Sequence, residues 1–475
     1  MLSLLRQSCF LTVIAGVLAA CSSAQDGATS APPAPTTEPP QPEVRASIHF
    51  FSERDGFATE VQSIVYSDQL RVRLEGLPPN EEVSLVLSMY SPGAEDRGYT
   101  SETVFVADAD GRVDTGLAAP VRGGYEGVDP DGVVWSAKEG PLPEGLGPDR
   151  IATYVSVKAG DTVLASAVLG RTLTSTTVST ELVTEDGLVA ELFIPAGAND
   201  KVPIVAFGGS EGGIRGGELY AARVASWGHP VLAVAYFGMQ GVPSDLTKVP
   251  LEYFGKAFTY LDSRSETRKG KYVVMGGSRG GELALLLGAT FPSVVGVIAD
   301  TPSSYRWAGL SLDGAAAWTF EGKDLPFVPS SSMWPSKTKG PAGKNAWVLR
   351  TTFESDMQKA APAALEAARI EVEKTNGAIL MFGGSEDSMW PACDFIDRAR
   401  AKLEASGHVA AHQDEAICFP KAGHSVTSIG LPTTDSMWAM LGSDLYALGG
   451  SAAANAYAGR ARDAKVRSFL ERVTK

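Results

Sequence analysis

From about Thr172 to the C-terminus, short apolar runs alternate with helical segments, and this alternation restricts the fold more than any other feature of the chain. After two strand-like stretches, TTVSTELV and LVAELFIP, the runs are PIVAF, VLAVAYF, KYVVMG, VVGVIAD, AILMF and AICFP. Apolar strands separated by helices form a mostly parallel sheet with helices on both faces. The sequence therefore predicts an α/β domain over residues 172–475, closed by a last helix from Ala452 to about Val473.

The segment from Arg45 to about Arg171 has a different pattern. Its runs are rich in β-branched and aromatic residues and are separated by Gly, Pro, Asn and Asp: RASIHFF, VQSIVY, LRVRLEGL, VSLVLSMY, ETVFVAD and IATYVSVKAG. Several short strands at close spacing are typical of a β-sandwich. A chain of 475 residues is long enough for two domains, and we expect an N-terminal β-sandwich over residues 45–171.

An insertion interrupts the α/β pattern between about residues 303 and 375. It holds half of the eight tryptophans among many Gly, Pro and Ser residues, namely Trp307, Trp318, Trp334 and Trp347. Such a segment is either a lid or acyl pocket over the strand ends or a packed surface excursion without a role in substrate binding. The sequence leaves both readings open.

The first 20 residues form a targeting segment rather than part of a fold. Arg6 precedes an apolar run, Phe10 to Ala20, that is too short to anchor stably in a bilayer. Small residues before Cys21 are typical of a lipobox, which predicts cleavage before this cysteine and acylation of its sulfur. Cleavage of an ordinary signal peptide near Ala20 is the alternative. Several buried acyl chains anchor a protein stably, and Ser22 rather than Asp follows the cysteine, which favours the outer membrane of a Gram-negative cell.

Residues 21–44 are expected to form the lipidated cysteine and a tether. Ser22 to Glu43 contains six prolines and no large apolar residue, and it therefore cannot bury a core. The formal net charge of −14 favours solubility and argues against a nucleic-acid partner, which requires a basic face. We predict neither a cofactor nor a metal site.

The motif Gly276-Gly277-Ser278-Arg279-Gly280 follows the strand KYVVM and opens the helix GELALLLGATF. This is the G-x-S-x-G nucleophile elbow of α/β-hydrolases in its required strand–turn–helix context. Glycines two positions on either side are needed because side chains there would collide with the neighbouring strand and helix. The turn exposes the serine Oγ at a helix N-terminus, where developing negative charge is favoured. Ser278 is therefore the predicted nucleophile.

A second match, GGSEG, surrounds Ser210 after the earlier strand PIVAF. A glycine-rich loop at that position suits an oxyanion hole, whose donors are backbone N–H groups. We assign the N–H of Arg279 as one donor and that of Ser210, or else of Glu211, as the other. Each such donor contributes roughly 3–4 kcal/mol of transition-state stabilisation. A simple tight turn is the alternative reading of this loop.

A serine hydroxyl needs a general base, and the chain contains five histidines. The α/β-hydrolase order is serine, acid, histidine. His424 follows the last apolar strand in ICFPKAGHSV, and Asp387 follows the strand AILMF in GGSED. Glu386 is the rival acid. The remaining histidines lie before a strand or within one and are expected to be structural: His49, His229, His408 and His412.

Two cysteines remain besides those of the targeting segment and the lipidation site. Cys393 lies six residues after Asp387, and Cys418 lies six residues before His424. In an oxidising compartment the two thiols could pair beside the active site, or they could stay separate and buried. The sequence leaves this open.

The chain resembles the family of acyl-CoA thioesterases and bile acid-CoA:amino acid N-acyltransferases from about residue 45 to its end. The resemblance is carried by LRVRLEGLPPNEEV, GGYEGVDPDGVVWS, LAVAYF, LEYF, the elbow, IEVEKTNGAILMFGGSEDSMWP, KAGH and GGSAAANA. It implies a β-sandwich joined to an α/β-hydrolase domain, and a triad of Ser278, Asp387 and His424. The transferase branch has a cysteine where this chain has Ser278, and the resemblance therefore implies hydrolysis. Members that act on coenzyme A thioesters work inside cells, whereas this chain is expected to be exported, which leaves the leaving group open.

These observations predict a serine hydrolase that cleaves acyl thioesters or carboxylic esters through an acyl-enzyme. Acyl transfer to an amine or alcohol is the alternative within the same family. A non-catalytic surface binding protein on a retained fold is the third hypothesis. The expected partners are a small acyl substrate and, through Cys21, a membrane; the oligomeric state is not predicted.

Overall fold

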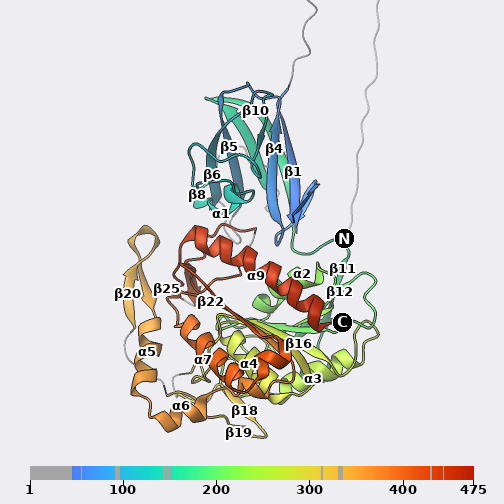
Figure 1. The fold of residues 1–475 in the computed structure, drawn as a ribbon, viewed down its shortest axis with the longest axis vertical. Helices are drawn as coiled ribbons and strands as arrows, with labels where there is room; N and C mark the ends of the chain where they lie inside the picture. The colour runs from blue at the N-terminus through green and yellow to red at the C-terminus, as the bar shows by residue number, and fades with distance from the viewer. Residues whose placement is uncertain are drawn as a thin grey trace, which may run out of the picture. The chain divides into compact units, whose positions relative to one another are not determined.

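The computed structural model describes residues 45–54, 56–90, 97–142, 146, 151–311, 314–329, 335–427, 430–441 and 443–475 (Figure 1). The expected signal peptide, Cys21 and the tether up to residue 44 lie outside the described residues. Within the described part of the chain, no helix has both the length and the apolar character needed to cross a bilayer.

Two mostly antiparallel sheets form the N-terminal domain, which confirms the predicted β-sandwich. One sheet has the order β3-β10-β9-β5-β6-β8 and the other β2-β1-β4-β7. Their strands are β1 (Ser47–Arg54), β2 (Phe57–Glu60), β3 (Ser63–Val65), β4 (Gln69–Glu75), β5 (Glu82–Tyr90), β6 (Arg97–Val106), β7 (Val113–Asp114), β8 (Lys138–Pro141), β9 (Thr153–Ala159) and β10 (Thr162–Thr172). Alternate residues of β4, such as Leu70 and Val72, share one core with Leu85 and Leu87 of β5, because side chains on a strand alternate between its two faces.

An eight-stranded sheet forms the centre of the second domain, in the order β11-β12-β14-β13-β16-β17-β22-β23. The last six strands of this order run parallel, whereas β12 lies antiparallel to both β11 and β14. The strands are β11 (Val178–Val183), β12 (Ala190–Pro195), β13 (Ile204–Phe207), β14 (Val231–Val234), β16 (Tyr272–Gly277), β17 (Val294–Asp300), β22 (Ala378–Gly384) and β23 (Glu415–Phe419). The two strand-like stretches that precede the alternation are thus the antiparallel edge of the sheet.

Helices cover both faces of this sheet, which confirms the predicted α/β arrangement (Figure 1). On one face lie α3 (Glu252–Asp262), α4 (Arg279–Thr290) and α7 (Ala392–Ala405), and on the other lie α2 (Arg215–Ala225) and α9 (Ala452–Val473). Within β13, Val205 and Phe207 belong to the first core, and Ile204 and Ala206 belong to the second. A strand that is buried on both faces has no polar position, which explains the continuous apolar runs.

The insertion folds into short elements. They are β18 (Trp318–Phe320), β19 (Lys323–Asp324), β20 (Ser336–Lys339), η2 (Pro341–Gly343), β21 (Asn345–Val348), α5 (Arg350–Lys359), α6 (Pro362–Ala368) and η3 (Val372–Lys374). β18 and β19 form a small sheet with β15 (Val249–Pro250), and β20 and β21 form another with β24 (Trp438–Leu441) and β25 (Asp444–Ala447). The remaining short helices are α1 (Gly132–Trp135), η1 (Glu185–Gly187) and α8 (His408–His412).

Two of the insertion's tryptophans are packed into the protein. Trp307 is 2% exposed and lies edge-on against Phe353 and near Phe395. Trp318 is 1% exposed and lies 5.9 Å from the ring of Tyr236. For these two residues the structure favours packing over a lid, whereas Trp334 lies outside the described residues.

The segment GGYEGVDPDGVVWS contacts the α/β domain. Its Asp129 carboxylate accepts hydrogen bonds from the indole N–H of Trp135 at 3.0 Å and from Arg460 of α9 at 2.9 Å. The carbonyl oxygen of Trp135 accepts a bond from the backbone N–H of Thr433 at 3.0 Å. The motif that carries much of the resemblance in the first domain thus has a structural task at the contact with the second.

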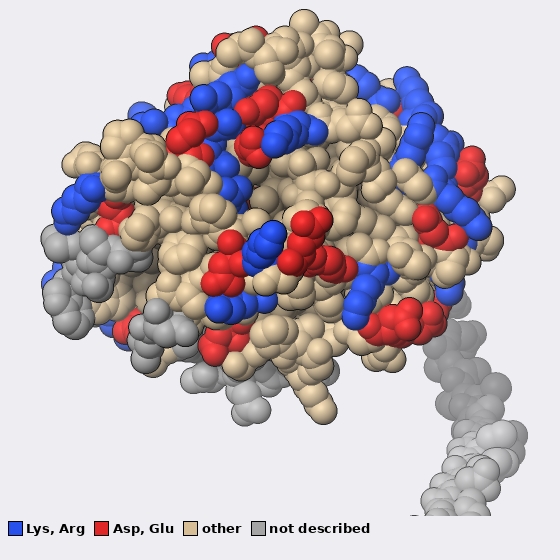
Figure 2. Space-filling model, turned by 90° about the horizontal axis from the view of Figure 1, so that it is seen from below, with Lys and Arg blue, Asp and Glu red and all other residues tan. Residues whose placement is uncertain are grey.

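On the face drawn in Figure 2, acidic and basic side chains intermix, as on an ordinary solvated surface.

Candidate active site

Ser278 occupies the sharp turn between β16 and α4. Its φ of 58° and ψ of −123° lie in a region that non-glycine residues rarely adopt. The backbone N–H of Ser278 donates to the carbonyl oxygen of Asp300 at 2.8 Å, which holds the turn against β17. A Cβ on Gly276 would lie 2.6 Å from the carbonyl oxygen of Gly280. A Cβ on Gly280 would collide with the carbonyl oxygen of Gly208. The two flanking glycines are therefore required by the packing of the elbow.

Ser210 does not have this geometry. It follows β13, but α2 begins only at Arg215, and the φ of Ser210 is not positive. The two G-x-S-x-G matches therefore differ in structure, and Ser278 alone of the two serines sits on an elbow.

His424 and Asp387 are brought together by two neighbouring loops, which follow β23 and β22. The Nδ1 of His424 lies 2.7 Å from Oδ2 of Asp387. The other carboxylate oxygen, Oδ1, accepts backbone N–H bonds from Met389 at 2.8 Å and Trp390 at 3.2 Å. Asp387 is 1% exposed, whereas Glu386 is exposed. A buried carboxylate with both oxygens bonded is suited to orient an imidazole, and Glu386 is not placed to do so.

Ser278 and His424 line the same pocket. The Nε2 of His424 is buried and has no hydrogen-bond partner among the described residues, and no bond to Ser278 Oγ is formed. Such contacts are often long in an unliganded hydrolase and shorten when substrate binds. The unpaired Nε2 therefore belongs to a residue that lines the same pocket as Ser278.

Three of the other histidines, His49, His408 and His412, have contacts away from the pocket, whereas the buried Nδ1 of His229 has no hydrogen-bond partner among the described residues. His408 lies 2.6 Å from Asp414 and 2.8 Å from the carbonyl oxygen of Thr375. The ring of His412 lies tilted against that of His408, with 4.3 Å between the ring centroids. His49 lies 2.8 Å from Glu60 on the adjacent strand. These contacts agree with the roles expected from sequence.

The glycine-rich loop after β13 borders the elbow. Gly208, Gly209 and Glu211 line the pocket, and a Cβ on Gly209 would lie 3.0 Å from that of Ser278. The N–H of Gly209 donates to Oε1 of Glu211 at 2.9 Å. Arg279 is the first residue of α4, and the N–H groups of a first helical turn have no partner within the helix. The N–H of Arg279 thus has no partner within the helix, whereas the N–H of Gly209 is bonded to Glu211, and Ser210 is not among the described residues that line the pocket.

A buried ion pair beneath the pocket was not expected from the sequence. Asp300, at the end of β17, accepts two bonds from the guanidinium of Arg462 on α9, at 3.0 and 2.8 Å. Both side chains are at most 2% exposed. Burial, together with the carboxylate of Asp300, raises the pKa of Tyr220 well above its ordinary value, and the tyrosine therefore stays neutral. Because these residues are far apart along the chain, no local pattern marks the cluster.

A second buried pair joins the elbow helix to the insertion. Arg279 lies 3.2 Å from Glu282 and donates to the carbonyl oxygen of Trp307 at 3.2 Å. Glu282 accepts the indole N–H of Trp318 at 2.7 Å. Burial raises the pKa of Glu282, against the opposing effect of Arg279.

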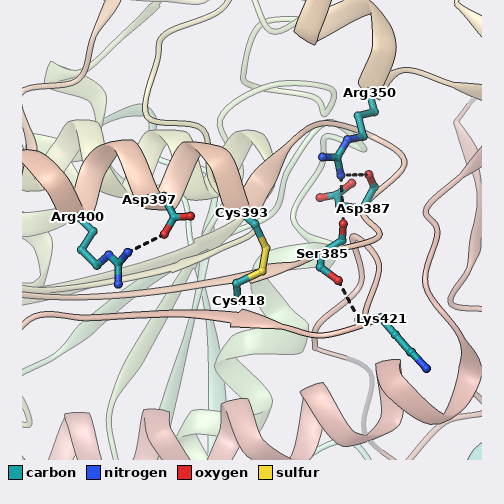
Figure 3. The surroundings of a disulfide bond; sticks show 8 residues. All are labelled: Arg350, Ser385, Asp387, Cys393, Asp397, Arg400, Cys418 and Lys421. Atoms are coloured by element: carbon teal, nitrogen blue, oxygen red, sulfur yellow. Dashed lines mark hydrogen bonds and ion pairs between the residues drawn. A yellow bond between two sulfur atoms is a disulfide. The ribbon is translucent and has the colours of Figure 1, made fainter.

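Arg350, the first residue of α5, reaches from the insertion to the loop that carries the acid (Figure 3). Its Nη1 donates to the carbonyl oxygens of Ser385 at 3.3 Å and Asp387 at 3.1 Å. Its backbone N–H donates to the carbonyl oxygen of Ser388 at 3.1 Å. The insertion therefore contacts the loop of Asp387 through Arg350, whereas none of its described residues lines the pocket. No sequence signal distinguishes Arg350 from the other arginines.

Cys393 and Cys418 form a disulfide in the structure (Figure 3). It joins the start of α7 to β23, the two elements next to the loops of Asp387 and His424. Among the described residues, no group of three or more His, Cys, Asp or Glu side chains is arranged to hold a metal ion.

A strained serine at the carboxyl edge of this sheet, beside a histidine–carboxylate pair, is the arrangement of hydrolases with the α/β-hydrolase fold. The model "BAAT / Acyl-CoA thioester hydrolase C terminal" matches residues 249–475, and the model "Acyl-CoA thioester hydrolase/BAAT N-terminal region" matches residues 67–185. The chain therefore belongs to the acyl-CoA thioester hydrolase/BAAT family, as its motifs indicated, and it is a hydrolase of the thioesterase and esterase kind.

Two human relatives are each a quarter identical to the chain over the aligned residues. The chain is 25% identical over 392 residues to acyl-coenzyme A thioesterase 1 of Homo sapiens, covering 80% of this chain and 87% of that protein. It is 25% identical over 393 residues to the human mitochondrial acyl-coenzyme A thioesterase 2, covering 80% and 76%. Among solved structures, a putative dienelactone hydrolase from Klebsiella pneumoniae covers 62% of this chain and 98% of its own, at 13% identity and a TM-score of 0.37. The match to an esterase from Pyrobaculum calidifontis covers 62% of this chain and 85% of the esterase, at 14% identity and a TM-score of 0.38.

Proposed function

We propose that this hydrolase cleaves acyl esters or thioesters through a triad of Ser278, His424 and Asp387. The observation that carries the proposal is the 2.7 Å contact between His424 and Asp387 beside the same pocket as the strained Ser278. A general base held in one orientation by a buried carboxylate can activate a serine that is a poor nucleophile by itself.

The proposed reaction has two halves. His424 Nε2 takes the proton of Ser278 while Oγ attacks the carbonyl carbon, and the oxyanion is held by the N–H of Arg279 and by an N–H of the loop at Ser210 and Glu211. The tetrahedral intermediate collapses, the proton passes from His424 to the departing thiolate or alkoxide, and an ester on Ser278 remains. Water then gives a proton to His424, attacks this ester, and releases the acid as the proton returns to Ser278.

An active-site probe tests the proposal. A fluorophosphonate should label the protein at Ser278, as located by mass spectrometry of the peptide, and hydrolysis of p-nitrophenyl butyrate should be lost in Ser278→Ala. Ser210→Ala is the matched control, because this serine lies in the other G-x-S-x-G motif, and it should keep its labelling. Equal labelling of Ser278→Ala would sink the proposal.

Transfer of the acyl group to an amine or alcohol is the alternative within this family. It predicts an acyl conjugate when candidate acceptors are added, whereas hydrolysis gives free acid alone. We expect free acid, because a serine acyl-enzyme is expected to be hydrolysed more readily than to pass its acyl group to an amine.

We further propose that the chain is exported and acylated at Cys21. The supporting observations are the apolar run and the small residues that precede this cysteine. Metabolic labelling with a radioactive fatty acid should mark the wild type and leave Cys21→Ser unlabelled. A labelled Cys21→Ser chain would contradict lipidation at this position.

A further inference from the structure

The pocket at Ser278 is small. Its volume is about 170 Å³, and its lining includes Glu211, Tyr220, Asp300, Thr301, Thr427 and Leu448. A cavity of ~150 Å³ holds one benzene molecule, that is, six carbon atoms. Pockets for drug-sized ligands occupy ~300–1,000 Å³. The volume beside the nucleophile therefore matches a short acyl group, and it would not enclose a long fatty acyl chain.

The floor of the pocket is polar and held in place. A Cβ on Gly277 would lie 2.5 Å from the hydroxyl of Tyr220, which shows how closely the tyrosine approaches the elbow. Asp300 is held by both nitrogens of the Arg462 guanidinium that face it. Moving Asp300 aside to deepen the pocket would break a buried ion pair, which is strongly destabilising. A long chain therefore cannot make room by displacing the floor.

The large apolar side chains nearby are used elsewhere. Trp307 accepts a bond from Arg279 through its carbonyl oxygen, and Trp318 donates its indole N–H to Glu282, so both residues are bonded to the Arg279–Glu282 pair of α4. The described residues of the insertion contribute none of the side chains that line the pocket. Among the described residues that line the pocket, Leu448 is the one with a large aliphatic side chain. A fatty acyl chain would thus gain little apolar contact here.

We propose that the acyl pocket selects short acyl groups, of up to about six carbons, and discriminates against long-chain fatty acyl groups. This inference rests on the proposed function of Ser278. It adds the substrate class that the catalytic residues alone do not define.

The test is a series of p-nitrophenyl esters of constant leaving group, hydrolysed by the full-length chain below the critical micelle concentration of each ester. The series is acetate, butyrate, hexanoate, decanoate and laurate. We expect kcat/KM to be highest for acetate or butyrate and to fall at least about tenfold by decanoate. A kcat/KM for decanoate or laurate equal to or above that for butyrate would overturn the inference.

A widened pocket gives a second measurement. Thr301 has a φ of 40°, which glycine adopts without strain, and it is one of the residues that line the pocket. Thr301→Gly should therefore shift the optimum by about two carbons toward longer esters. Glu321→Gly is the matched control, because Glu321 has a φ of 51°, is exposed, and lies in the turn between β18 and β19. Glu321→Gly should have the same preference for ester chain length as the wild type. The same shift in both variants would contradict the inference that pocket size selects the acyl group.

Fluorophosphonate labelling distinguishes a failure of the short-chain inference from a failure of the proposed role of Ser278. Labelling of Ser278 combined with a preference for laurate would overturn the short-chain inference and leave the triad intact. Absence of both labelling and hydrolysis with every ester would overturn the proposed function itself.

Discussion

Removing the disulfide between Cys393 and Cys418 should lower the melting temperature of the α/β domain and leave kcat/KM nearly unchanged. The perturbation is the double variant Cys393→Ala/Cys418→Ala. The two cysteines are 25 residues apart along the chain. In the chain-entropy model, a loop of that length gives ~3.5 kcal/mol of stabilisation at 25 °C. Cys418 is exposed and Cys393 is half-buried, and truncation therefore adds little cavity cost.

This free energy converts into a shift of the melting temperature. For a domain of some 300 residues, with ~2.1 cal/mol/K of unfolding entropy per residue, the double variant should melt about 5 °C lower. Differential scanning calorimetry of the wild type, with and without dithiothreitol, should show the same decrease. The double variant is the control, because the reductant should not change its melting temperature.

Activity should be retained because other bonds hold the two catalytic loops together. Glu386 donates its N–H to the carbonyl oxygen of Ala422 at 2.9 Å, and His424 donates its N–H to that of Leu448 at 2.8 Å. We expect kcat/KM for a p-nitrophenyl ester at 25 °C to change by less than about twofold, since these contacts are independent of the disulfide. An unchanged melting temperature would refute the loop-entropy argument. A lost activity in a folded variant would refute the claim that the loops are held independently.

Three further perturbations test other contacts. Arg350→Ala should lower kcat about tenfold and leave KM unchanged, because the acid loop loses the donor that holds Asp387, and Arg350→Lys should restore part of kcat. Arg462→Met should lower the free energy of unfolding in urea by about 3–5 kcal/mol, because the buried Asp300 is left unpaired. Burial lowers the pKa of His229 from 6.5 to about 4, and the unfolded chain therefore binds its proton first as the pH falls. The free energy of unfolding should therefore decrease as the pH falls from 6.5 toward 4. In denaturation experiments, His229→Asn should show a smaller decrease over that window. An identical decrease in this variant would contradict the lowered pKa of His229.

The architecture could be predicted because its signals are local. Continuous apolar runs mark strands that are buried on both faces, as β13 shows with one core on each side. Alternation in the first domain marks strands that are buried on one face, as in β4. The elbow is also local, because a strand, a turn with glycines and a helix follow one another within a few residues around Ser278.

The candidate site was predictable only in part. Ser278, His424 and Asp387 follow separate strands, and the parallel sheet brings the strand ends to one edge, so that chain order was enough to select them. The sequence does not decide whether the insertion is a lid over the site or a packed surface segment. The burial of Trp307 and Trp318 favours packing for these two residues.

What the sequence alone determined is therefore the fold class, the place of the elbow and the order of the candidate triad, because each depends on residues that are near in the chain or on the direction of neighbouring strands. Only the tertiary structure decided the pairing of Asp300 with Arg462, the reach of Arg350 to the acid loop and the joining of Cys393 to Cys418. The partners of these contacts are separated by 25 to about 160 residues, and their proximity results from the packing of whole helices on the sheet, which no local pattern encodes. The size of the pocket belongs to this second group, because its floor and walls come from segments that meet only in the folded protein.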